Sequence, residues 1–401
     1  MAAIEYPRFL DLPDTVAPDY QGGSLLNLMA SLRARFGDRR AVAARLRDEA
    51  ALPLADARVV VLLVIDGLGA RDLAVRGQGR WLARQQVGTL TTVFPAATAS
   101  AVTTTLTGVS PAEHGLTGWY IRDDRFGGVL APLPMVRRDR QPMTGWWRMP
   151  RLFPYPSLFQ RLKARSAMVG PESILGSPFN MRHSRGVARH YAYRGLAALE
   201  AQLVQAVSDL GSLEGFVYAY HADYDALAHR FGIASPECDA HFAALDAMLE
   251  RVGARLAGRD ALLLVTADHG FIDSPPDRQC DIAAEGDLQA SLDGPLWGER
   301  RVAYCRVKPG LQPRFEAEAT ARLGDRFHVV PGARLIDAGV FGPAAKPSRR
   351  LRERVGDFAL IGRENWTLYD WLPGEARYPM LGVHAGVSAE EMLIPLVAIS
   401  G

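Results

Sequence analysis

The sequence contains few cysteines and no long apolar run. Its three cysteines, Cys238, Cys280 and Cys305, are odd in number and widely spaced, which argues against a disulfide framework and against a Cys-x-x-Cys metal motif. Arg, Asp or Gly interrupts every apolar stretch before it reaches the roughly 18 residues that a membrane-spanning helix needs. The chain does not begin with a basic segment followed by an apolar one, so we expect no signal peptide. These features predict a cytoplasmic protein with no membrane partner.

A strong excess of one charge is also missing. The chain has 46 Lys and Arg residues against 44 Asp and Glu residues, a formal net charge of +2, which argues against a dedicated nucleic-acid surface. With 401 residues, of which 48% are hydrophobic, the chain can bury a full-sized core. It can form one large α/β domain, or a core domain with a second one inserted. No feature of the sequence fixes an oligomeric state.

Several apolar stretches are typical of strands that are buried on both faces. Residues 58–65, 215–220 and 261–266 are continuous apolar runs, as in a parallel sheet, and a final strand is expected near the C-terminus. Helical periodicity is present at residues 238–257 and at residues 24–37, where we expect a surface helix capped by a serine. The sequence therefore predicts an α/β fold with a central, mostly parallel sheet between helical layers.

Polar side chains directly follow two of these strands. Asp66 comes after the first run and is followed by glycines, and the adjacent Asp268 and His269 come after residues 261–266. Open α/β sheets place their sites at the carboxyl ends of the strands. Asp66 alone is explained equally well as a helix cap. Asp268 and His269 are harder to explain as packing, because burying such groups is costly unless they are bonded or act as ligands.

A further pair of an Asp and a His follows the strand at residues 215–220. With Asp223 as the cap of the next helix, Asp225 and His229 are one turn apart and project from the same face. Such a pair can chelate a metal ion. The alternative is a carboxylate at a helix start with a nearby imidazole, which is common on surface helices. His221 is an alternative metal ligand, or it contacts a ligand without binding the metal ion itself.

The stretch at residues 91–115, TTVFPAATASAVTTTLTGVSPAEHG, contains many small hydroxyl residues. Residues 99–106 can form a helix with Thr98 near its N-terminus, where the first N–H groups and the helix dipole favour an anionic phosphoryl oxygen and lower the pKa of a hydroxyl. Thr98 is therefore the candidate nucleophile. Ser100 is a candidate substrate contact, although capping and packing also explain it.

The last part of the chain carries one more candidate ligand. His384 lies between glycines, in a loop with room to reach a metal ion. Ser388 and Glu391 have the spacing of a helix capping box, so we interpret Glu391 as structural. Upstream of His384, residues 274–365 are rich in Arg, Gly and Pro, and we expect them to form an inserted cap.

Aromatic residues gather in the long loop region that follows the hydroxyl-rich stretch. This region is rich in Gly, Pro, Trp and Arg and has no sustained periodicity, which is typical of a long loop close to a site. Its aromatic side chains either form a wall of a binding site for a nucleobase or aryl group, or they pack in the hydrophobic core. They are Trp119, Tyr120, Trp146 and Trp147.

Seven side chains together form a candidate metal centre. They supply three carboxylates, three imidazoles and one hydroxyl from separate parts of the chain. They are Asp66, Thr98, Asp225, His229, Asp268, His269 and His384. Mixed carboxylate and imidazole ligands suit zinc, and manganese or iron also fits these ligand types. Two divalent ions about 3.5 to 4 Å apart would hold the attacking and leaving oxygens of an in-line displacement.

The same segments resemble the alkaline phosphatase superfamily and, within it, the type I phosphodiesterase and nucleotide pyrophosphatase family. They are VVLLVIDGLG, FPAATASAVTTTLTGVSPAEHG, DALAH, LLLVTADHGF and VHAGVSAEEMLIPL, in the order of that family. They extend from about Val59 to the C-terminus, and the expected cap carries no matching motif. The resemblance implies an alkaline-phosphatase-like catalytic core of residues 1–273 and 366–401, with an inserted cap of residues 274–365.

The resemblance also implies roles for the seven residues. One ion would be bound by Asp66, Thr98, Asp268 and His269, and the other by Asp225, His229 and His384. Thr98 would attack a small phosphate ester, such as a nucleotide, and form a phosphothreonine intermediate that is then hydrolysed. Relatives carry an Asn near the nucleophile, and we place the corresponding position at Ala101. Ser100, or the backbone N–H groups after Thr98, would then contact the phosphoryl oxygen instead.

Three other functions fit the same residues. Relatives in the superfamily hydrolyse the C–P bond of phosphonoacetate with a similar Thr and metal set, and a phosphomonoesterase is a further alternative. A different class is an interaction module such as the defence-associated PglZ proteins, which resemble the superfamily at the HAGVSAEEM-like end but usually have much longer chains. Sulfate ester hydrolysis is disfavoured, because none of the cysteines begins a CxPxR motif.

Overall fold

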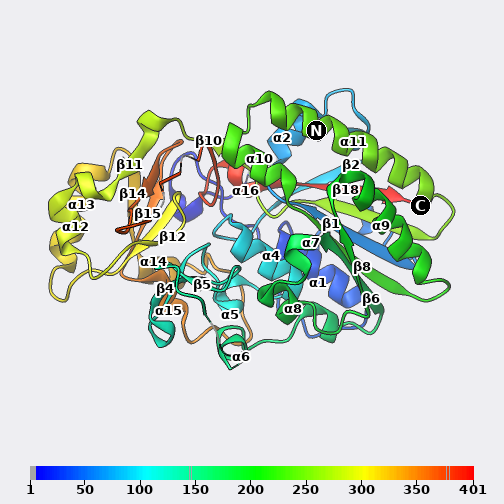
Figure 1. Cartoon of the computed structure of the whole chain (residues 1–401), viewed down its shortest axis with the longest axis horizontal. Coiled ribbons are helices and arrows are strands. Elements are labelled where there is room, and N and C mark those ends of the chain that lie inside the picture. Colours follow the sequence, from blue (N-terminus) through cyan, green and yellow to red (C-terminus); the bar gives the residue numbers. More distant parts are fainter. Residues whose placement is uncertain (1–5, 144, 146, 376, 379) are drawn as a thin grey trace.

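The computed structural model describes residues 6–143, 145, 147–375, 377–378 and 380–401, which form two lobes side by side (Figure 1). The strands of the larger lobe are β1 (Val59–Ile65), β2 (Gln86–Thr91), β6 (Arg165–Pro171), β7 (Arg189–Tyr193), β8 (Gly215–His221), β9 (Ala261–Thr266) and β18 (Leu393–Ser400). They form one sheet in the order β2-β18-β9-β1-β8-β6-β7. Neighbours from β9 to β7 are parallel, whereas β18 is antiparallel to β9 and β2. The prediction of a central, mostly parallel sheet is confirmed.

Strand β1 lies at the centre of this sheet. None of its residues is more than 1% exposed, because β8 and β9 cover its edges and helices cover both faces of the sheet. A continuous apolar run is what such a position requires. Ile65 lies beside His221 of β8, and Val64 lies beside Thr266 of β9. The residues that follow β1, β8 and β9 therefore leave the sheet at the same edge.

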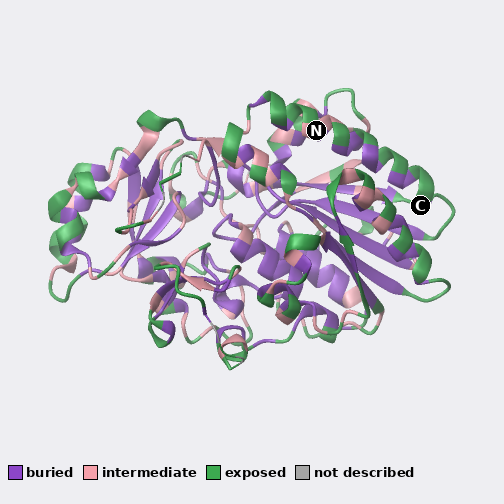
Figure 2. Ribbon diagram, viewed as in Figure 1, coloured by how far each residue is buried: buried purple, intermediate pink, exposed green. Residues whose placement is uncertain are grey.

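Helices cover both faces of the sheet, and Figure 2 shows the buried strands between them. The helices up to β9, together with the last one, are α1 (Leu25–Arg35), α2 (Ala70–Arg76), α3 (Trp81–Arg84), α4 (Thr98–Thr107), α5 (Pro111–His114), α6 (Arg148–Leu152), α7 (Glu172–Leu175), α8 (Pro178–His183), α9 (Gly195–Asp209), α10 (Asp223–Phe231), α11 (Pro236–Leu256) and α16 (Ala389–Met392). In Figure 1, α2, α10 and α11 lie above the sheet, and α1 and α4 lie below it. No helix in the described ranges is long and apolar enough to cross a membrane.

Helix α1 begins where the sequence predicts but is not a surface helix. Ser24 caps it in a capping box with Asn27. However, its residues from 25 to 33 are all buried. The irregular segment that follows folds back over it, since the Leu46 N–H donates to Ser31 Oγ (2.9 Å) and Asn27 Nδ2 donates to the Ala44 carbonyl (2.7 Å). The apolar periodicity predicts this helix correctly, but it cannot predict its burial, because the segment that covers α1 has no periodicity of its own.

The smaller lobe is built on an antiparallel sheet in the order β12-β13-β15-β14. Its elements are β12 (Trp297–Gly298), β13 (Val302–Cys305), β14 (Phe327–Pro331) and β15 (Phe358–Gly362), with α12 (Gly286–Ser291), α13 (Gln312–Leu323), α14 (Gly332–Asp337) and α15 (Leu351–Val355). Successive residues of β13 point to opposite faces of this sheet. Val302 and Tyr304 belong to one apolar cluster, and Ala303 and Cys305 belong to another.

Short ladders lie where the chain passes between the lobes. β10 (Ile272–Asp273) pairs with β17 (Gly382–Val383), and β11 (Gln279–Asp281) pairs with β16 (Thr367–Tyr369). Contact with the smaller lobe therefore continues beyond residue 365. A three-stranded sheet of β3 (Ile121–Asp123), β4 (Gly128–Ala131) and β5 (Val136–Arg137) occupies much of the region predicted to be a long loop.

One buried ion pair joins the two lobes. Arg301, which precedes β13, donates from Nε to Glu391 Oε1 (3.0 Å) and from Nη2 to Glu391 Oε2 (2.9 Å). Both side chains are at most 1% exposed. Glu391 also accepts from the Gly386 N–H (2.7 Å) and from Ser388 Oγ (2.8 Å). Ser388 caps α16, since its Oγ accepts from the Glu391 N–H (3.3 Å), and the structural interpretation of Glu391 is confirmed. The Glu391 carboxylate binds Arg301 and the Gly386 N–H, so it fixes the loop that follows His384.

Glu391→Gln is expected to destabilise the protein by about 3 to 5 kcal/mol, because it leaves the Arg301 charge buried without a counter-charge. The matched control is Glu390→Gln, which removes a carboxylate paired with the largely exposed Arg71 and should cost less than about 1 kcal/mol. Chemical denaturation of the two variants measures both values. Equal stability of the two variants would contradict this role of the buried pair.

Candidate metal centre and active site

The candidate residues converge at the shared carboxyl edge of β1, β8 and β9. Asp66 directly follows β1, and Asp268 and His269 follow β9. Gly67 has a φ of 78°, and a Cβ there would collide with the Phe271 ring. Glycine is therefore required beside Asp66. Asp225 and His229 come from α10, Thr98 begins α4, and His384 follows β17. All seven predicted residues are brought to one place.

His269 lies at the middle of the cluster. Its Nε2 atom is 3.1 Å from Thr98 Oγ1, 3.3 Å from Asp66 Oδ1 and 3.5 Å from Asp268 Oδ2. Asp66, Asp268 and His269 form one group whose ligand atoms all lie within 4.8 Å of one another. The Thr98 hydroxyl thus lies against a group of two carboxylates and one imidazole.

A second group adjoins the first. His229 Nε2 is 3.3 Å from Asp225 Oδ1, and His384 Nε2 is 3.8 Å from the same oxygen. The rings of His269 and His384 stack with centroids 3.7 Å apart. The ligand atoms of Asp225, His269 and His384 also lie within 4.8 Å of one another, so His269 lies close to both groups. The i, i+4 spacing correctly placed Asp225 and His229 on one face of α10.

The backbone fixes the orientation of all three imidazoles. The Nδ1 atoms of His229, His269 and His384 lie 2.9, 3.2 and 3.1 Å from the carbonyls of Gly382, Gly270 and Ala96. With Nδ1–H donating to a carbonyl, each ring presents a bare Nε2 to the cluster. Metal-ligating histidines are commonly held in this way.

The carboxylates have oxygens that no described group satisfies. Asp66 Oδ1, Asp225 Oδ1 and Asp268 Oδ2 are buried without a hydrogen-bond partner in the described part of the chain. Other oxygens of two of them are bonded: Tyr220 Oη donates to Asp66, and the Gly67 N–H donates to Asp268 Oδ1 (3.0 Å). Burial raises the pKa of Asp66 to about 6 and the pKa of Asp225 and Asp268 well above the ordinary value. Three unpartnered carboxylate oxygens facing three bare imidazole nitrogens fit divalent cations.

The raised carboxyl pKa values predict a pH-dependent stability of the metal-free protein. Because burial raises the pKa of Asp225 and Asp268 in the folded protein, the unfolded chain releases these protons at a lower pH than the folded protein does, so the stability falls as the pH rises between the two pKa values of each carboxyl. Within that range each such carboxyl contributes about 1.4 kcal/mol per pH unit. Burial lowers the pKa of the three histidines, which gives a slope of opposite sign, so the carboxyl contribution is measured against a variant that lacks one carboxyl.

Thermal midpoints of the metal-free wild type and of metal-free Asp268→Asn, measured from about pH 5 to about pH 8.5, check this expectation. The wild-type midpoint should fall relative to that of Asp268→Asn as the pH rises, and saturating zinc should remove this relative fall. A wild-type midpoint that rises or stays constant relative to that of the variant would contradict it.

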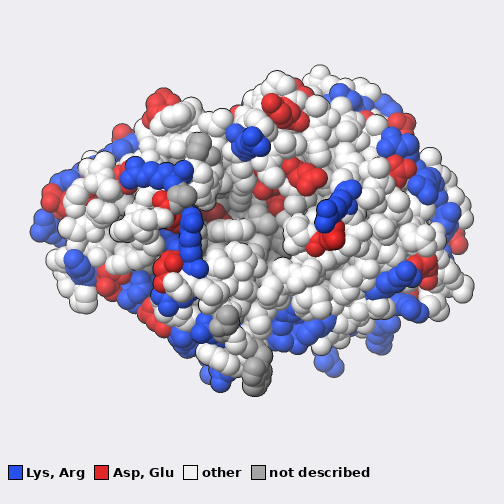
Figure 3. Space-filling view, viewed as in Figure 1, with Lys and Arg blue, Asp and Glu red and all other residues white. Residues whose placement is uncertain are grey.

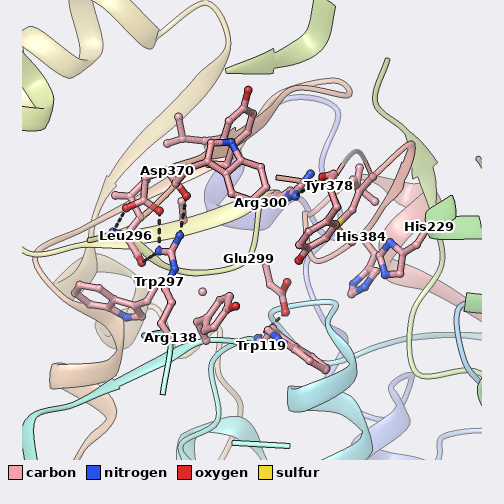
Figure 4. Close-up of a pocket in the computed structure, with 18 of the residues that line it drawn as sticks. Trp119, Arg138, His229, Leu296, Trp297, Glu299, Arg300, Asp370, Tyr378 and His384 are labelled. Atoms are coloured by element: carbon pink, nitrogen blue, oxygen red, sulfur yellow. Dashed lines mark hydrogen bonds and ion pairs between the residues drawn. The ribbon is translucent and has the colours of Figure 1, made fainter. Parts of the chain in front are cut away.

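A hollow between the two lobes leads to one side of the cluster, and Figure 3 shows this face of the molecule hollowed there. A cavity of about 290 Å³ is lined by Thr98, Asp225, His229 and His384 from the larger lobe. Its other walls are aromatic and charged side chains from both lobes, which Figure 4 shows as sticks. They include Trp119, Tyr120, Arg138, Trp297, Glu299, Arg300, Tyr369, Trp371 and Tyr378.

A second cavity, of about 380 Å³, adjoins the cluster within the larger lobe. Asp66, Thr98, Trp119 and Asp225 line part of it. Its remaining walls are mostly apolar and include Val102, Leu106, Leu133, Met168, Val169, Ile174, Leu175 and Phe179. Thr98, Trp119 and Asp225 line both cavities, so the hydroxyl lies between a polar, aromatic space and an apolar one.

Several sequence-based expectations differ from the structure. Ser100 is fully buried, its hydroxyl donates to the Leu116 carbonyl (3.0 Å), and it lines neither cavity. Ala101, the position expected to correspond to the Asn of relatives, is fully buried within the core and lines neither cavity. Trp119, in contrast, lines both cavities. Asp223 is the first residue of α10, not its cap, which is Ala222.

The rival ligand and the aromatic residues have distinct positions. The His221 ring nitrogens contact Tyr193 Oη (3.0 Å) and His241 Nε2 (2.9 Å), away from the cluster. Trp119 and Tyr120 line the polar cavity. Trp147 stacks on Phe126 instead, and Trp146 lies outside the described residues. Glu299 and Arg300 also line the polar cavity, and no local pattern in the sequence predicts this, because they come from a distant part of the chain.

Comparisons with known proteins identify the class. A profile described as type I phosphodiesterase / nucleotide pyrophosphatase matches residues 60–385. No curated protein is similar enough in sequence to match. The solved structure of murine ectonucleotide pyrophosphatase / phosphodiesterase 5 is similar, with a TM-score of 0.60, 18% identity and coverage of 84% of this chain and 87% of that one. The same murine protein, as an inactive variant in complex with AMP, gives the same values.

Phosphonoacetate hydrolase from Sinorhizobium meliloti, in complex with phosphonoacetate, is similarly related. Its TM-score is 0.62, with 18% identity and coverage of 86% of this chain and 91% of that one. The chain therefore shares the fold of these two hydrolases. Because the family profile covers most of its length, the chain belongs to the type I phosphodiesterase/nucleotide pyrophosphatase family of hydrolases.

Proposed function

We propose that this protein is a phosphodiesterase or pyrophosphatase that cleaves a small phosphate ester, such as a nucleotide, with Thr98 as nucleophile and two divalent ions, zinc in the first instance. The observation that carries the proposal is the position of the Thr98 hydroxyl, 3.1 Å from Nε2 of His269, which itself lies beside Asp66 and Asp268 and their unpartnered oxygens. The family profile supports the reaction class. The AMP complex of the murine relative supports a nucleotide as a possible substrate of this chain.

The chain's own residues suit an in-line displacement at phosphorus. One ion would be held by Asp66, Thr98, Asp268 and His269, and the other by Asp225, His229 and His384. When bound, the ions would supply Lewis-acid polarisation of the phosphoryl oxygens and the threonine hydroxyl. Thr98 forms the new O–P bond as the bond to the leaving group breaks, and water later cleaves the phosphothreonine. The N–H groups that open α4 favour the phosphoryl charge.

A second candidate is C–P bond hydrolysis of a phosphonoacetate-type substrate. The phosphonoacetate complex of the similar hydrolase favours it, since that structure matches this chain over most of both lengths. The same Thr98 and ligand set would serve this reaction. It differs from the first candidate in the bond that is broken and in the presence of a carboxylate on the substrate.

Turnover of three substrates with added zinc tests the proposal. Bis-p-nitrophenyl phosphate should be hydrolysed with a higher kcat/KM than p-nitrophenyl phosphate, and phosphonoacetate should be the poorest substrate. A dominant activity on phosphonoacetate would favour the second candidate. Tightly bound metal without turnover of any of the three would overturn the hydrolase proposal and favour an interaction module.

We also propose a cytoplasmic location. Cys238, Cys280 and Cys305 are all free and buried, which fits a reducing compartment. Cell fractionation tests this. Recovery of the protein only from an extracytoplasmic fraction would contradict it.

A further inference from the structure

Arg300 is an unusual cation in the polar cavity beside the cluster. Its guanidinium lies over three aromatic rings, with distances from Cζ to the ring centroids of 5.7 Å for Tyr369, 5.3 Å for Trp371 and 5.1 Å for Tyr378. Nη2 donates to the Tyr378 carbonyl (3.2 Å). Figure 4 shows Arg300 beside Tyr378 on the wall of the cavity. The rings hold the guanidinium in place without neutralising it.

No carboxylate among the described residues lies within ion-pair distance of Arg300. The other arginine of this cavity, Arg138, differs in this respect. Arg138 pairs with Asp370 Oδ1 (2.7 Å) and with Glu375 Oε2 (3.1 Å) and also donates to the Leu296 carbonyl (2.8 Å). Its charge is therefore compensated within the protein. Arg300 has five N–H donors. Within the described chain these donors form a single hydrogen bond, to the Tyr378 carbonyl.

The carboxyl group next to Arg300 in sequence does not compensate its charge. Glu299 Oε1 accepts instead from the Trp119 N–H (2.6 Å). Burial raises the pKa of Glu299 to about 8, so at neutral pH this carboxyl is mostly protonated and can itself donate a hydrogen bond. The cavity thus presents a positive group and a neutral acid.

The geometry points to Arg300 as a specificity-determining residue that binds a second anionic group of the substrate, a carboxylate or a phosphate. This inference rests on the proposed function, since the scissile phosphoryl group would lie at Thr98 in the same cavity. The volume of about 290 Å³ is at the small end for ligand pockets. The second anion is therefore carried on a short substituent, not on a polymer or a long chain.

A planar guanidinium suits either kind of anion. It can bind a carboxylate or a phosphate through two parallel N–H donors. Its fixed position over the rings reduces the entropy lost on binding. Tyr378 is 52% exposed, so the mouth of this subsite is open to solvent and a charged group can enter.

Calorimetric binding to the zinc-loaded full-length protein tests this inference without requiring turnover. The probes are 3-phosphonopropionate, ethane-1,2-bisphosphonate and propylphosphonate, which share a phosphonate and differ at the other end. We expect at least one of the two charged probes to bind about 10-fold or more tightly than propylphosphonate, as for a charge-assisted hydrogen-bonded pair. The better of the two charged probes identifies the second anion as a carboxylate or a phosphate.

Three variants link this preference to Arg300. Arg300→Met should reduce the affinity ratio to about one, and Arg300→Lys should retain part of it, because Lys keeps the charge without the planar fork. The matched control is Arg278→Met, which removes another arginine of the smaller lobe that lies over an aromatic ring, Trp366, outside the cavity. This control should keep the wild-type ratio.

Equal or absent binding of the three probes by the wild type would overturn the inference, as would an unchanged ratio in both Arg300 variants. Failure of the proposed function has a different signature. In that case the substrate panel shows no turnover, whatever the binding ratio. An active enzyme with equal affinities would refute only the role of Arg300.

Discussion

Thr98→Ala is expected to lower kcat for bis-p-nitrophenyl phosphate by about 10⁴-fold or more, because loss of a covalent nucleophile leaves only binding and electrostatic contributions. Thr98 begins α4 and lines both cavities. Its Oγ1 atom lies 3.1 Å from His269 Nε2. Steady-state kinetics of the zinc-loaded variant measures the effect. The metal content of the same samples distinguishes loss of the nucleophile from loss of a ligand.

The matched control is Thr103→Ala in the same helix. Thr103 is fully buried, and its hydroxyl donates to the Ala99 carbonyl one turn earlier (2.6 Å). This variant should keep near-native turnover. The assignment of the nucleophile would be wrong if Thr98→Ala remained active while Thr103→Ala or Ser100→Ala abolished turnover.

Asp268→Asn is expected to reduce bound zinc from two ions per chain to one or fewer and to lower kcat/KM by about 10³-fold or more. Asp268 is fully buried, and its Oδ1 accepts from the N–H groups of Gly67 and His269 (both 3.0 Å). An asparagine can keep these two hydrogen bonds through its carbonyl oxygen. It then turns an amide, not a carboxylate oxygen, towards the cluster. Elemental analysis after dialysis, together with kinetics, measures both effects.

Asp246→Asn provides the matched comparison. Asp246 is another buried aspartate that accepts from backbone N–H groups, those of Leu82 (2.6 Å) and Trp81 (3.4 Å), and it lines neither cavity beside the cluster. Its substitution should leave zinc content and kcat/KM near the wild-type values. Loss of zinc in this variant, or full retention in Asp268→Asn, would contradict the ligand assignment.

Much of the central sheet was predictable because its strands are continuous apolar runs. The run before Asp66 becomes β1, and the run before Asp268 becomes β9, with residues 261–266 as expected. Parallel strands that end at one edge bring the residues after them together. The positions of Asp66, Asp225 and Asp268 after three such strands were therefore enough to predict a shared site. The i, i+4 pair at Asp225 and His229 followed from helix periodicity alone.

Other features depend on contacts between distant segments and had no local signal. Arg300 reaches the cavity from the smaller lobe, where β12 and β13 are short and the flanking residues lack periodicity. The partner of the Ser100 hydroxyl also had no local signal, because Leu116, whose carbonyl accepts from it, lies outside α4 and is brought there by the path of the chain after the helix. The burial of α1 depends on an irregular segment whose packing no pattern predicts.

The central claim is that seven residues hold two divalent ions beside Thr98, and anomalous diffraction at the zinc edge from crystals of the zinc-loaded protein tests it most directly. We predict two strong peaks in each chain, both at the carboxyl edge of β1, β8 and β9. One peak should be bounded by Asp66, Thr98, Asp268 and His269, and the other by Asp225, His229 and His384. A single peak, or a main peak elsewhere, such as between His221 and His241, would contradict the account.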